Sequence, residues 1–477
     1  MHRLDSSTYI RSDTPPSPEK VPPSLDDKIT KASKRAISSL SAEQSPSYAS
    51  KKPRTLFLDD DTLYIQKQRI LSFEEKAKAC TDFFTIPRIS LADEVSSWSQ
   101  RSHALINDPL EGEIISLDTS NKESAKGVSS TFFLVDTGLQ KKHSVIKPAI
   151  GMIADLHRPL RLGIPYHEMV VREQVASVVA TDLLSVGIDA RLPKTTAVQI
   201  LSDKFPTIAN YDESVGPISL TCSMQEFVPN TGSVETLSSA EKEAIPPLEI
   251  RTLAILDILL NNTDRREANT LIGKDGHLIP IDHSLTLSKD LIDKPRFFWL
   301  TLSSAKTHFS PREKAAIARL DWNTMRSHLL EEIPGLDSKI LEMANTTLEF
   351  LKIGAALDLT PFELGSFMLK SRFHNAEQSF LQVCHDKALT ISSDFSTNII
   401  ATLHEYLEPC ALALRNPEYS DLQELLPEQE GVKSYALQAC ANELTYHITT
   451  GAPFSAKSLS KRMDMTKERK ESVFGGG

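Results

Sequence analysis

The apolar and polar residues of the chain first follow a strand pattern and then a helical one. Residues 131–135 and 144–146 are short β-rich runs, and Asp136-Thr137-Gly138 between them is typical of a hairpin turn. The apolar residues from Met169 to Leu183 recur at roughly helical spacing. Two further strand candidates lie at residues 195–201 and 218–227. This order predicts an α+β lobe.

A second pattern begins with residues 248–260, which are strongly apolar and predict a buried helix. It ends at Asn261-Asn262, residue types that suit a helix end. After a polar loop, residues 269–272 and 277–281 flank Asp275-Gly276, which favours a second hairpin. From residue 311 onward the pattern is helical, with breaks near Pro334-Gly335, Pro361 and Asn416-Pro417.

The composition bounds the class of protein. The chain has 477 residues, 40% hydrophobic and 24% charged, with a formal net charge of -10. This length suffices for about two to three domains, and the mildly acidic balance argues against nucleic acid as a partner. Residues 1–54 are rich in Ser, Pro and Lys and are predicted to form a disordered leader. Within it, Lys51 to Arg54 is either a solvated linker or a basic address signal.

The cysteines show neither paired nor metal-ligand spacing, so a disulfide scaffold and a zinc module are poorly supported and a reducing compartment is expected. They are Cys80, Cys222, Cys384, Cys410 and Cys440. The N-terminus lacks the apolar stretch of a signal peptide, and no run approaches the roughly 18 apolar residues of a membrane-spanning helix. The chain is therefore expected to be soluble.

The strongest chemical signal runs from Asn262 to Asn269, with Ile281-Asp282 beyond the second hairpin. An acid, an amide and a second acid in this order can converge on one point, as phosphoryl transfer requires. Asp264 would orient or deprotonate the attacking hydroxyl, while the oxygens of Asn269 and Asp282 would hold magnesium. The alternative is that these residues only cap a turn and a strand end.

These motifs resemble the phosphatidylinositol 3-/4-kinase-like superfamily, and most closely its type II phosphatidylinositol 4-kinases, which carry an Asn-Thr-Asp-Arg-x-x-x-Asn loop and an Ile-Asp strand. The resemblance covers roughly Gly127 to Leu330 and includes the aromatic segment Phe297 to Leu300. It implies a bilobal kinase-like fold over residues 55–340, with a β-rich N-lobe and a helical C-lobe. It also implies ATP and Mg²⁺ or Mn²⁺ as cofactors.

The resemblance extends to the nucleotide site. The segment Gly127 to Val135 is similar to the nucleotide-covering loop, and Val145 to Pro148 is similar to the family's lysine strand. Backbone N–H groups and one lysine would offset the charge of the triphosphate. The implied ATP-binding residues are Gly127, Ser129, Ser130 and Lys147, together with the hinge residues Gln225, Glu226, Phe227 and Val228. The alternative for the hinge is an ordinary edge strand.

Lys147 needs a carboxylate partner on the helix that follows the first hairpin. Glu173 is the expected partner because it fits the family's helix phase better, and Glu168 is the fallback. The catalytic set would then be Asp264, Lys147 and Glu173. Type II lipid kinases carry a palmitoylated cysteine-rich insertion that is missing here, which favours a Ser/Thr protein kinase. A phosphatidylinositol 4-kinase and an inactive kinase-fold scaffold remain alternatives.

The C-terminal region, residues 341–477, is expected to be an all-α domain with basic residues among apolar ones. It resembles the phosphatidylinositol 4-phosphate-binding tails of Legionella effector proteins, with Lys370, Arg372 and His447 as lipid-binding candidates. That resemblance implies a secreted bacterial effector acting in the host cytoplasm on a protein substrate, at phosphoinositide-containing membranes. The alternative is a helical cap that supports the kinase lobe.

Overall fold

The structure is a computed structural model. It describes residues 91–107, 112–116, 131–149, 166–205, 219–262, 264–288, 297–369, 379–391, 394–416, 423–425, 432–450, 452 and 454–474. The chain divides into two units, residues 1–68 and 69–477, and only the second contains described residues. The predicted leader therefore lies outside the described residues.

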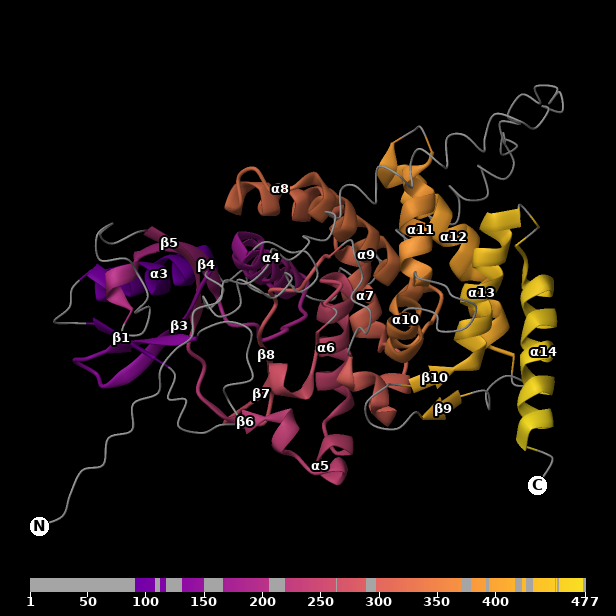
Figure 1. The fold of residues 1–477 in the computed structure, drawn as a ribbon, viewed down its shortest axis with the longest axis horizontal. Helices are drawn as coiled ribbons and strands as arrows, with labels where there is room; N and C mark the ends of the chain where they lie inside the picture. The colour runs from indigo at the N-terminus through magenta and orange to yellow at the C-terminus, as the bar shows by residue number, and fades with distance from the viewer. Residues whose placement is uncertain are drawn as a thin grey trace, which may run out of the picture. The chain divides into compact units, whose positions relative to one another are not determined.

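The first lobe is a five-stranded antiparallel sheet with two helices, and we call it the sheet lobe (residues 91–226) (Figure 1). The strands lie in the order β1-β2-β3-β5-β4. Its elements are α3 (Leu91–Asn107), β1 (Gly112–Ser116), β2 (Phe132–Asp136), β3 (Lys141–Pro148), α4 (Tyr166–Ser185), β4 (Thr195–Leu201), η4 (Ser202–Lys204) and β5 (Ser219–Glu226). The predicted hairpin, helix and two strands are confirmed, whereas α3 and β1 had no predicted counterpart.

The two faces of this sheet differ in polarity because side chains alternate along a strand. One face presents Phe132, Ile146, Cys222 and Met224, which pack with Leu105 of α3 in a hydrophobic core. The residues between them point the other way, and in β5 these are the buried polar residues Ser223 and Gln225. Lys147 follows Ile146 in β3 and so lies on the polar face.

The helical lobe (residues 230–369) contains the second predicted hairpin, β7 (Thr270–Gly273) and β8 (Leu278–Pro280), paired with β6 (Asn230–Ser233). Gly276 has φ +82°, which explains the Asp-Gly turn. Its helices are α5 (Ser239–Glu243), α6 (Pro247–Leu259), α7 (Pro311–Arg319), α8 (Trp322–Glu332), α9 (Ser338–Ala356) and α10 (Pro361–Met368). Short 3-10 turns are η5 (Val234–Thr236), η6 (Glu267–Asn269), η7 (Phe298–Thr301) and η8 (Ser303–Lys306).

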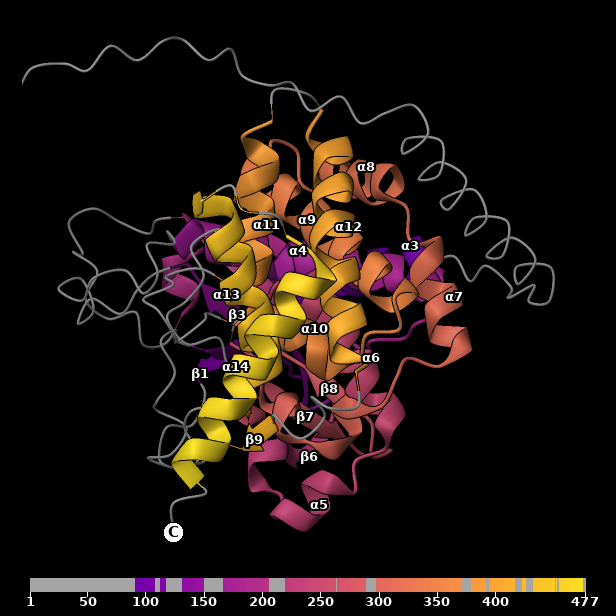
Figure 2. The same cartoon turned by 90° about the vertical axis from the view of Figure 1, so that its right-hand side faces the viewer.

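The C-terminal region continues without a break in the hydrophobic core. It contains α11 (Phe380–Leu389), α12 (Phe395–Leu414), β9 (Gln423–Leu425), β10 (Val432–Ser434), α13 (Tyr435–Thr450) and α14 (Ala456–Phe474). Figure 2 shows α13 and α14 side by side. The boundary expected at residue 341 falls inside α9, and Leu348 of α9 shares one core with Leu403 and Leu444.

The expectation that this region is entirely helical needs one correction. β9 and β10 pair as an antiparallel two-stranded sheet, with Val432 opposite Leu425. Both strands are mostly polar, so the sequence pattern gave no strand signal for them. The fold is otherwise the mixed α+β arrangement that the sequence predicts. No helix in the described part of the chain is long and apolar enough to cross a membrane.

Candidate active site

Three charged side chains from three separate elements meet at the polar face of the sheet. The ammonium nitrogen of Lys147 lies 2.8 Å from Glu173 Oε1 of α4 and 3.2 Å from Asp282 Oδ1, which follows β8. Glu173 is buried, and the Asp282 side chain is 33% exposed. The lysine therefore links the sheet, the α4 helix and the loop after the second hairpin.

The charges of this cluster reinforce one another. Burial alone would lower the pKa of Lys147, but the carboxylates of Asp282 and Glu173 outweigh it and raise that pKa. In return the lysine charge lowers the pKa of the Asp282 carboxyl, against the opposing effect of burial. Lys147 is therefore cationic and Asp282 anionic at neutral pH. The fallback partner, Glu168, instead lies 3.2 Å from Arg172 Nη2, one helical turn away.

The loop after α6 places Asp264 and Asn269 next to each other. The side-chain oxygen of Asn262 accepts a hydrogen bond from the Asp264 N–H at 3.2 Å. The Asn269 side-chain nitrogen donates to the Asp264 carbonyl at 2.9 Å. Arg266 Nε lies 3.1 Å from Asp264 Oδ1. The loop thus fixes the orientation of the Asn269 amide and sets a cation beside the Asp264 carboxylate.

Arg265 holds this loop against the strand that carries Asp282. Its guanidinium donates to the carbonyls of Asn269 at 2.6 Å and Ile281 at 2.8 Å. Its Nε lies 3.0 Å from Asp257 Oδ1 of α6, and neither side chain of this pair is exposed. The Ile281 N–H also donates to the Asn269 carbonyl at 3.0 Å. One buried side chain therefore sets the spacing of the two expected metal ligands.

Two further buried groups complete this support. Trp299 Nε1 donates to Asp257 Oδ2 at 3.0 Å, so the aromatic segment packs directly beneath the loop. Arg265 Nη2 lies 2.8 Å from His283 Nε2. Burial and the charges of Arg265 and Lys147 lower the pKa of His283 well below its ordinary value of 6.5. The imidazole is therefore neutral at pH 7, which lets Nε2 accept from the arginine.

Sequence reasoning gave no role to Asp257, Arg265 or His283. Two signals were available, the arginine of the Asn-Thr-Asp-Arg motif, which falls on Arg265, and Asp257, a lone carboxylate within an otherwise apolar run of helix α6. Burial raises the pKa of Asp257, while Arg265, Trp299 and Asn262 act in the opposite direction. Such a residue needs a buried partner, because an unpaired buried charge is costly.

The residues present fit a magnesium ion. Mg²⁺ prefers oxygen ligands and is usually held by one or two protein groups together with substrate phosphates. Asn269 uses its side-chain nitrogen for the Asp264 carbonyl, which leaves the amide oxygen for a metal. Asp282 provides an ionised carboxylate, and its φ of +60° shows that the backbone is held in an uncommon conformation there.

The hinge segment at the end of β5 contains polar groups that bond within the sheet and a backbone N–H that does not. Gln225 is buried, and its amide donates to Thr195 Oγ1 at 3.1 Å, so its side chain supports the sheet. The N–H groups of Glu226 and Phe227 donate to the carbonyls of Lys194 and His143. Of the three hinge amides after Gln225, Val228 is the one that the described sheet bonds leave available for a nucleotide base.

Several predicted site residues cannot be placed. Gly127, Ser129, Ser130, Lys370 and Arg372 lie outside the described residues.

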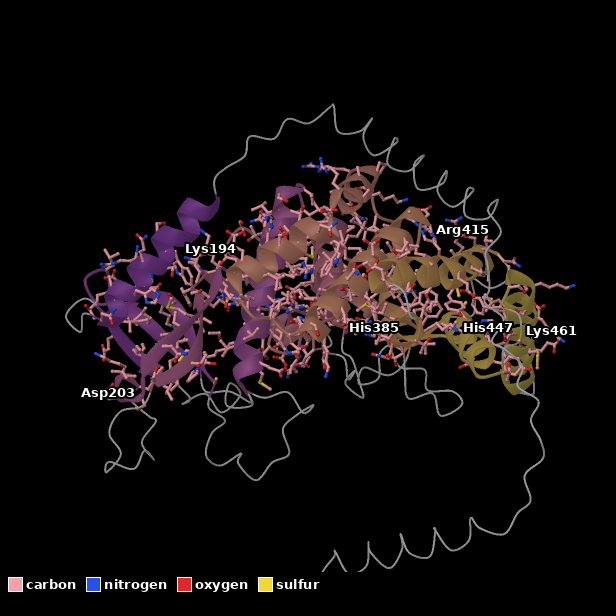
Figure 3. All side chains as sticks on the ribbon, turned by 90° about the horizontal axis from the view of Figure 1, so that it is seen from above. Lys194, Asp203, His385, Arg415, His447 and Lys461 are labelled. Atoms are coloured by element: carbon pink, nitrogen blue, oxygen red, sulfur yellow. The ribbon has the colours of Figure 1, made fainter. Side chains whose placement is uncertain are left out.

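His447 of α13 is half-buried, and its ring centroid lies 5.7 Å from that of Tyr406 and 5.9 Å from that of Phe454. Its Nδ1 lies against the carbonyl of Ala452. Figure 3 shows His447 among the C-terminal helices and Lys461 on α14.

A lysine strand, a glutamate helix and an acid-amide-acid loop around one point define a kinase-like domain. Residues 167–310 match the family described as "Phosphatidylinositol 3- and 4-kinase", so the chain carries a domain of the phosphatidylinositol 3-/4-kinase-like superfamily. The matched range includes Glu173, Asp264, Asn269 and Asp282. Lys147 lies outside it, and its assignment depends on its contacts with Glu173 and Asp282.

Curated relatives agree with this superfamily. Phosphatidylinositol 4-kinase gamma 4 of Oryza sativa subsp. japonica is 30% identical over 201 residues, which is 40% of this chain and 35% of that protein. Phosphatidylinositol 4-kinase gamma 3 of Arabidopsis thaliana is 28% identical over 342 residues, or 64% of this chain and 57% of that protein. The chain thus spans between about a third and somewhat over half of these relatives.

Proposed function

We propose that this chain is a kinase that transfers the γ-phosphoryl group of ATP to a hydroxyl group, with a divalent cation. The observation that carries the proposal is Lys147, which bridges Glu173 at 2.8 Å and Asp282 at 3.2 Å. A lysine oriented by a helix-borne glutamate, next to a metal-binding aspartate, is the arrangement that kinases use to hold the phosphates of ATP.

Each residue has a distinct task in this proposal. Asp264 accepts or orients the proton of the attacking hydroxyl, and Lys147 offsets charge on the nucleotide phosphates. Asn269 and Asp282 hold the metal, which when bound neutralises phosphate charge. Arg266 Nε, 3.1 Å from Asp264 Oδ1, orients that carboxylate. The Val228 N–H would donate a hydrogen bond to the adenine.

Two phosphoryl acceptors are compatible with this site, and each is favoured by its own observation. A protein Ser or Thr is favoured by the lack of a cysteine cluster near the kinase core, where only Cys222 falls between residues 127 and 330. The inositol ring of phosphatidylinositol is favoured by the names of the two curated relatives above, both phosphatidylinositol 4-kinases. The two acceptors share one catalytic set, so an acceptor assay decides between them.

The assay incubates the full chain with γ-labelled ATP and Mg²⁺, in parallel with a Ser/Thr-rich protein mixture and with phosphatidylinositol vesicles. Label in protein, including the chain itself, with none in lipid supports the protein acceptor, and the opposite result supports the lipid acceptor. Chelation of the cation should stop either transfer. If wild-type chain labels neither acceptor under conditions in which it binds ATP, the inactive scaffold replaces the kinase proposal.

We also propose that the C-terminal region binds phosphatidylinositol 4-phosphate at a membrane surface. Lys457 and Lys461 of α14 are exposed, and the exposed Tyr446 and Met465 lie on the same helical pair. Exposed cations beside apolar side chains suit an anionic lipid surface. His447 packs inward among aromatic rings, so the two lysines replace it as the residues to test.

The test uses the full chain, because α9 and the C-terminal helices share one core. Lys457→Glu with Lys461→Glu should reduce cosedimentation with vesicles that contain phosphatidylinositol 4-phosphate. The matched control is Lys339→Glu, an exposed lysine on α9. Equal sedimentation of wild type with neutral and phosphoinositide vesicles would leave the helical-cap alternative in place.

A further inference from the structure

The helix that carries Glu173 packs both against strands β4 and β5 of the sheet and against α8 of the helical lobe. Val175, Val179 and Leu183 of α4 belong to the same hydrophobic core as Leu329 of α8 and Leu348 of α9. The core beneath the sheet's apolar face is separate and contains no α4 residue. The apolar surface of α4 is therefore buried by the helical lobe, and moving α4 away would expose it to water.

Polar contacts add to this apolar packing, and two of them come from α8. His328 Nδ1 lies 2.6 Å from Asp182 Oδ1, where Asp182 is 5% exposed. Gln174, which follows Glu173, donates to the carbonyl of Glu332 at 3.1 Å. A third contact joins Arg319 of α7 to the carbonyl of Val186, just beyond the end of α4. These contacts hold both the Glu173 end and the far end of the helix.

Polar groups link the sheet to α4. Ser177 Oγ of α4 accepts from the Thr195 N–H at 3.1 Å, and Lys147 reaches Glu173 from β3. The buried residues on this face of β5 are Ser223 and Gln225. A polar interface of this kind binds less strongly than an apolar core. Helix α4 is therefore held from two sides, by polar contacts with the sheet and by apolar packing and hydrogen bonds with α8.

From this packing we infer that α8 is a built-in brace that fixes α4, with His328 and Asp182 as positioning residues for Glu173. The inference rests on the proposed kinase function. In kinases the lysine–glutamate pair must be in place for transfer, and displacement of the glutamate helix is one way of switching transfer off. Here the helix is held from within the chain, so the pair is assembled without a partner protein or a phosphorylated loop.

The experiment compares His328→Ala with His328→Asn in the full chain. Asparagine Nδ2 stands where histidine Nδ1 donates, so it retains the bond to Asp182 that alanine removes. The matched control is His308→Ala, a histidine whose Nδ1 contacts the backbone carbonyl of Asp358 at 2.9 Å and its carboxylate at 3.4 Å, away from α4. Readouts are kcat, KM for ATP, nucleotide-analogue binding, and hydrogen exchange of residues 166–185.

His328→Ala should lower kcat per folded molecule by between about twofold and thirtyfold, the range of couplings carried through packed elements. His328→Asn and His308→Ala should stay within twofold of wild type, and only His328→Ala should speed exchange in α4. A His328→Ala chain with unchanged kcat overturns the inference while leaving the kinase proposal intact. If wild type transfers no phosphate, the kinase proposal fails, and unchanged exchange and nucleotide binding in His328→Ala would then overturn the brace as well.

Discussion

Arg265→Met should be among the most destabilising single substitutions in the helical lobe. The side chain is fully buried and contacts Asp257, His283 and the carbonyls of Asn269 and Ile281. Methionine has a similar length without the charge. The substitution therefore leaves the Asp257 carboxylate buried, with Trp299 and Asn262 as its remaining donors among the described residues.

The expected loss follows from that burial. Removing one partner of a buried ion pair costs about 3–5 kcal/mol, because the remaining charge has no compensation. A domain is stable by only about 5–15 kcal/mol, so the variant should lose a large fraction of its free energy of unfolding. The neighbouring arginine provides a matched control. Arg266 pairs with Asp264 and is 37% exposed, so Arg266→Met should change stability by less than about 1 kcal/mol.

Urea titration followed by circular dichroism measures both variants, with the midpoint as readout. A third chain carries Arg265→Met together with Asp257→Asn, which removes the stranded charge. This double variant should be more stable than Arg265→Met alone, since much of the cost lies in the unpaired carboxylate. Equal midpoints for Arg265→Met and Arg266→Met would refute the stabilising role of the buried Arg265–Asp257 pair.

Two further outcomes follow from the packing and the pKa values. Gly365→Ala should destabilise the chain by about 1–3 kcal/mol, because the added methyl would lie 2.5 Å from the ring of buried Trp299. The control Gly138→Ala should be tolerated, because the nearest atom to its added methyl is 3.4 Å away. Equal melting temperatures for the two variants would contradict this expectation. Because the pKa of folded His283 lies well below 6.5, the unfolded chain binds an extra proton under acid conditions, so stability should fall as the pH drops below 6.5, by up to about 1.4 kcal/mol per unit. His283→Gln should flatten this pH dependence of stability between pH 7.5 and 5.5. An identical slope in wild type and His283→Gln would show that His283 is not its source.

The elements that the sequence predicted correctly share a strong local signal. The apolar run of α6 ends at Leu259, next to the Asn261-Asn262 stop, and the Asp-Gly turn of β7–β8 requires the positive φ of Gly276. By contrast, β1 is an edge strand of five residues, and β9 and β10 have three each. Unlike β2 and β8, which are equally short, these strands contain few apolar residues, so they depend on a partner strand that a local pattern does not reveal.

The candidate site likewise contains residues that the sequence predicted and residues that it did not. The expected partner of Lys147 lies 2.8 Å away because the hairpin and the following helix are neighbours in the chain. The catalytic roles of these residues stay predictions. The support under the site depends on contacts that no short window contains, such as Trp299 with Asp257 and His328 with Asp182. Side-chain type alone did not show that Arg265 is buried while Arg266 is half-exposed.

The central claim is that Lys147 and Asp282 act on the phosphates of ATP, and one transfer assay tests it. Wild type, Lys147→Met and Asp282→Ala are incubated with γ-labelled ATP and Mg²⁺, with Asp203→Asn, an exposed aspartate on η4, as the control. Wild type and the control should transfer label alike, while both site variants should stay folded and lose about two to four orders of magnitude in rate. Transfer by either site variant within about threefold of wild type would contradict it, since such a rate leaves no lost electrostatic contact to explain.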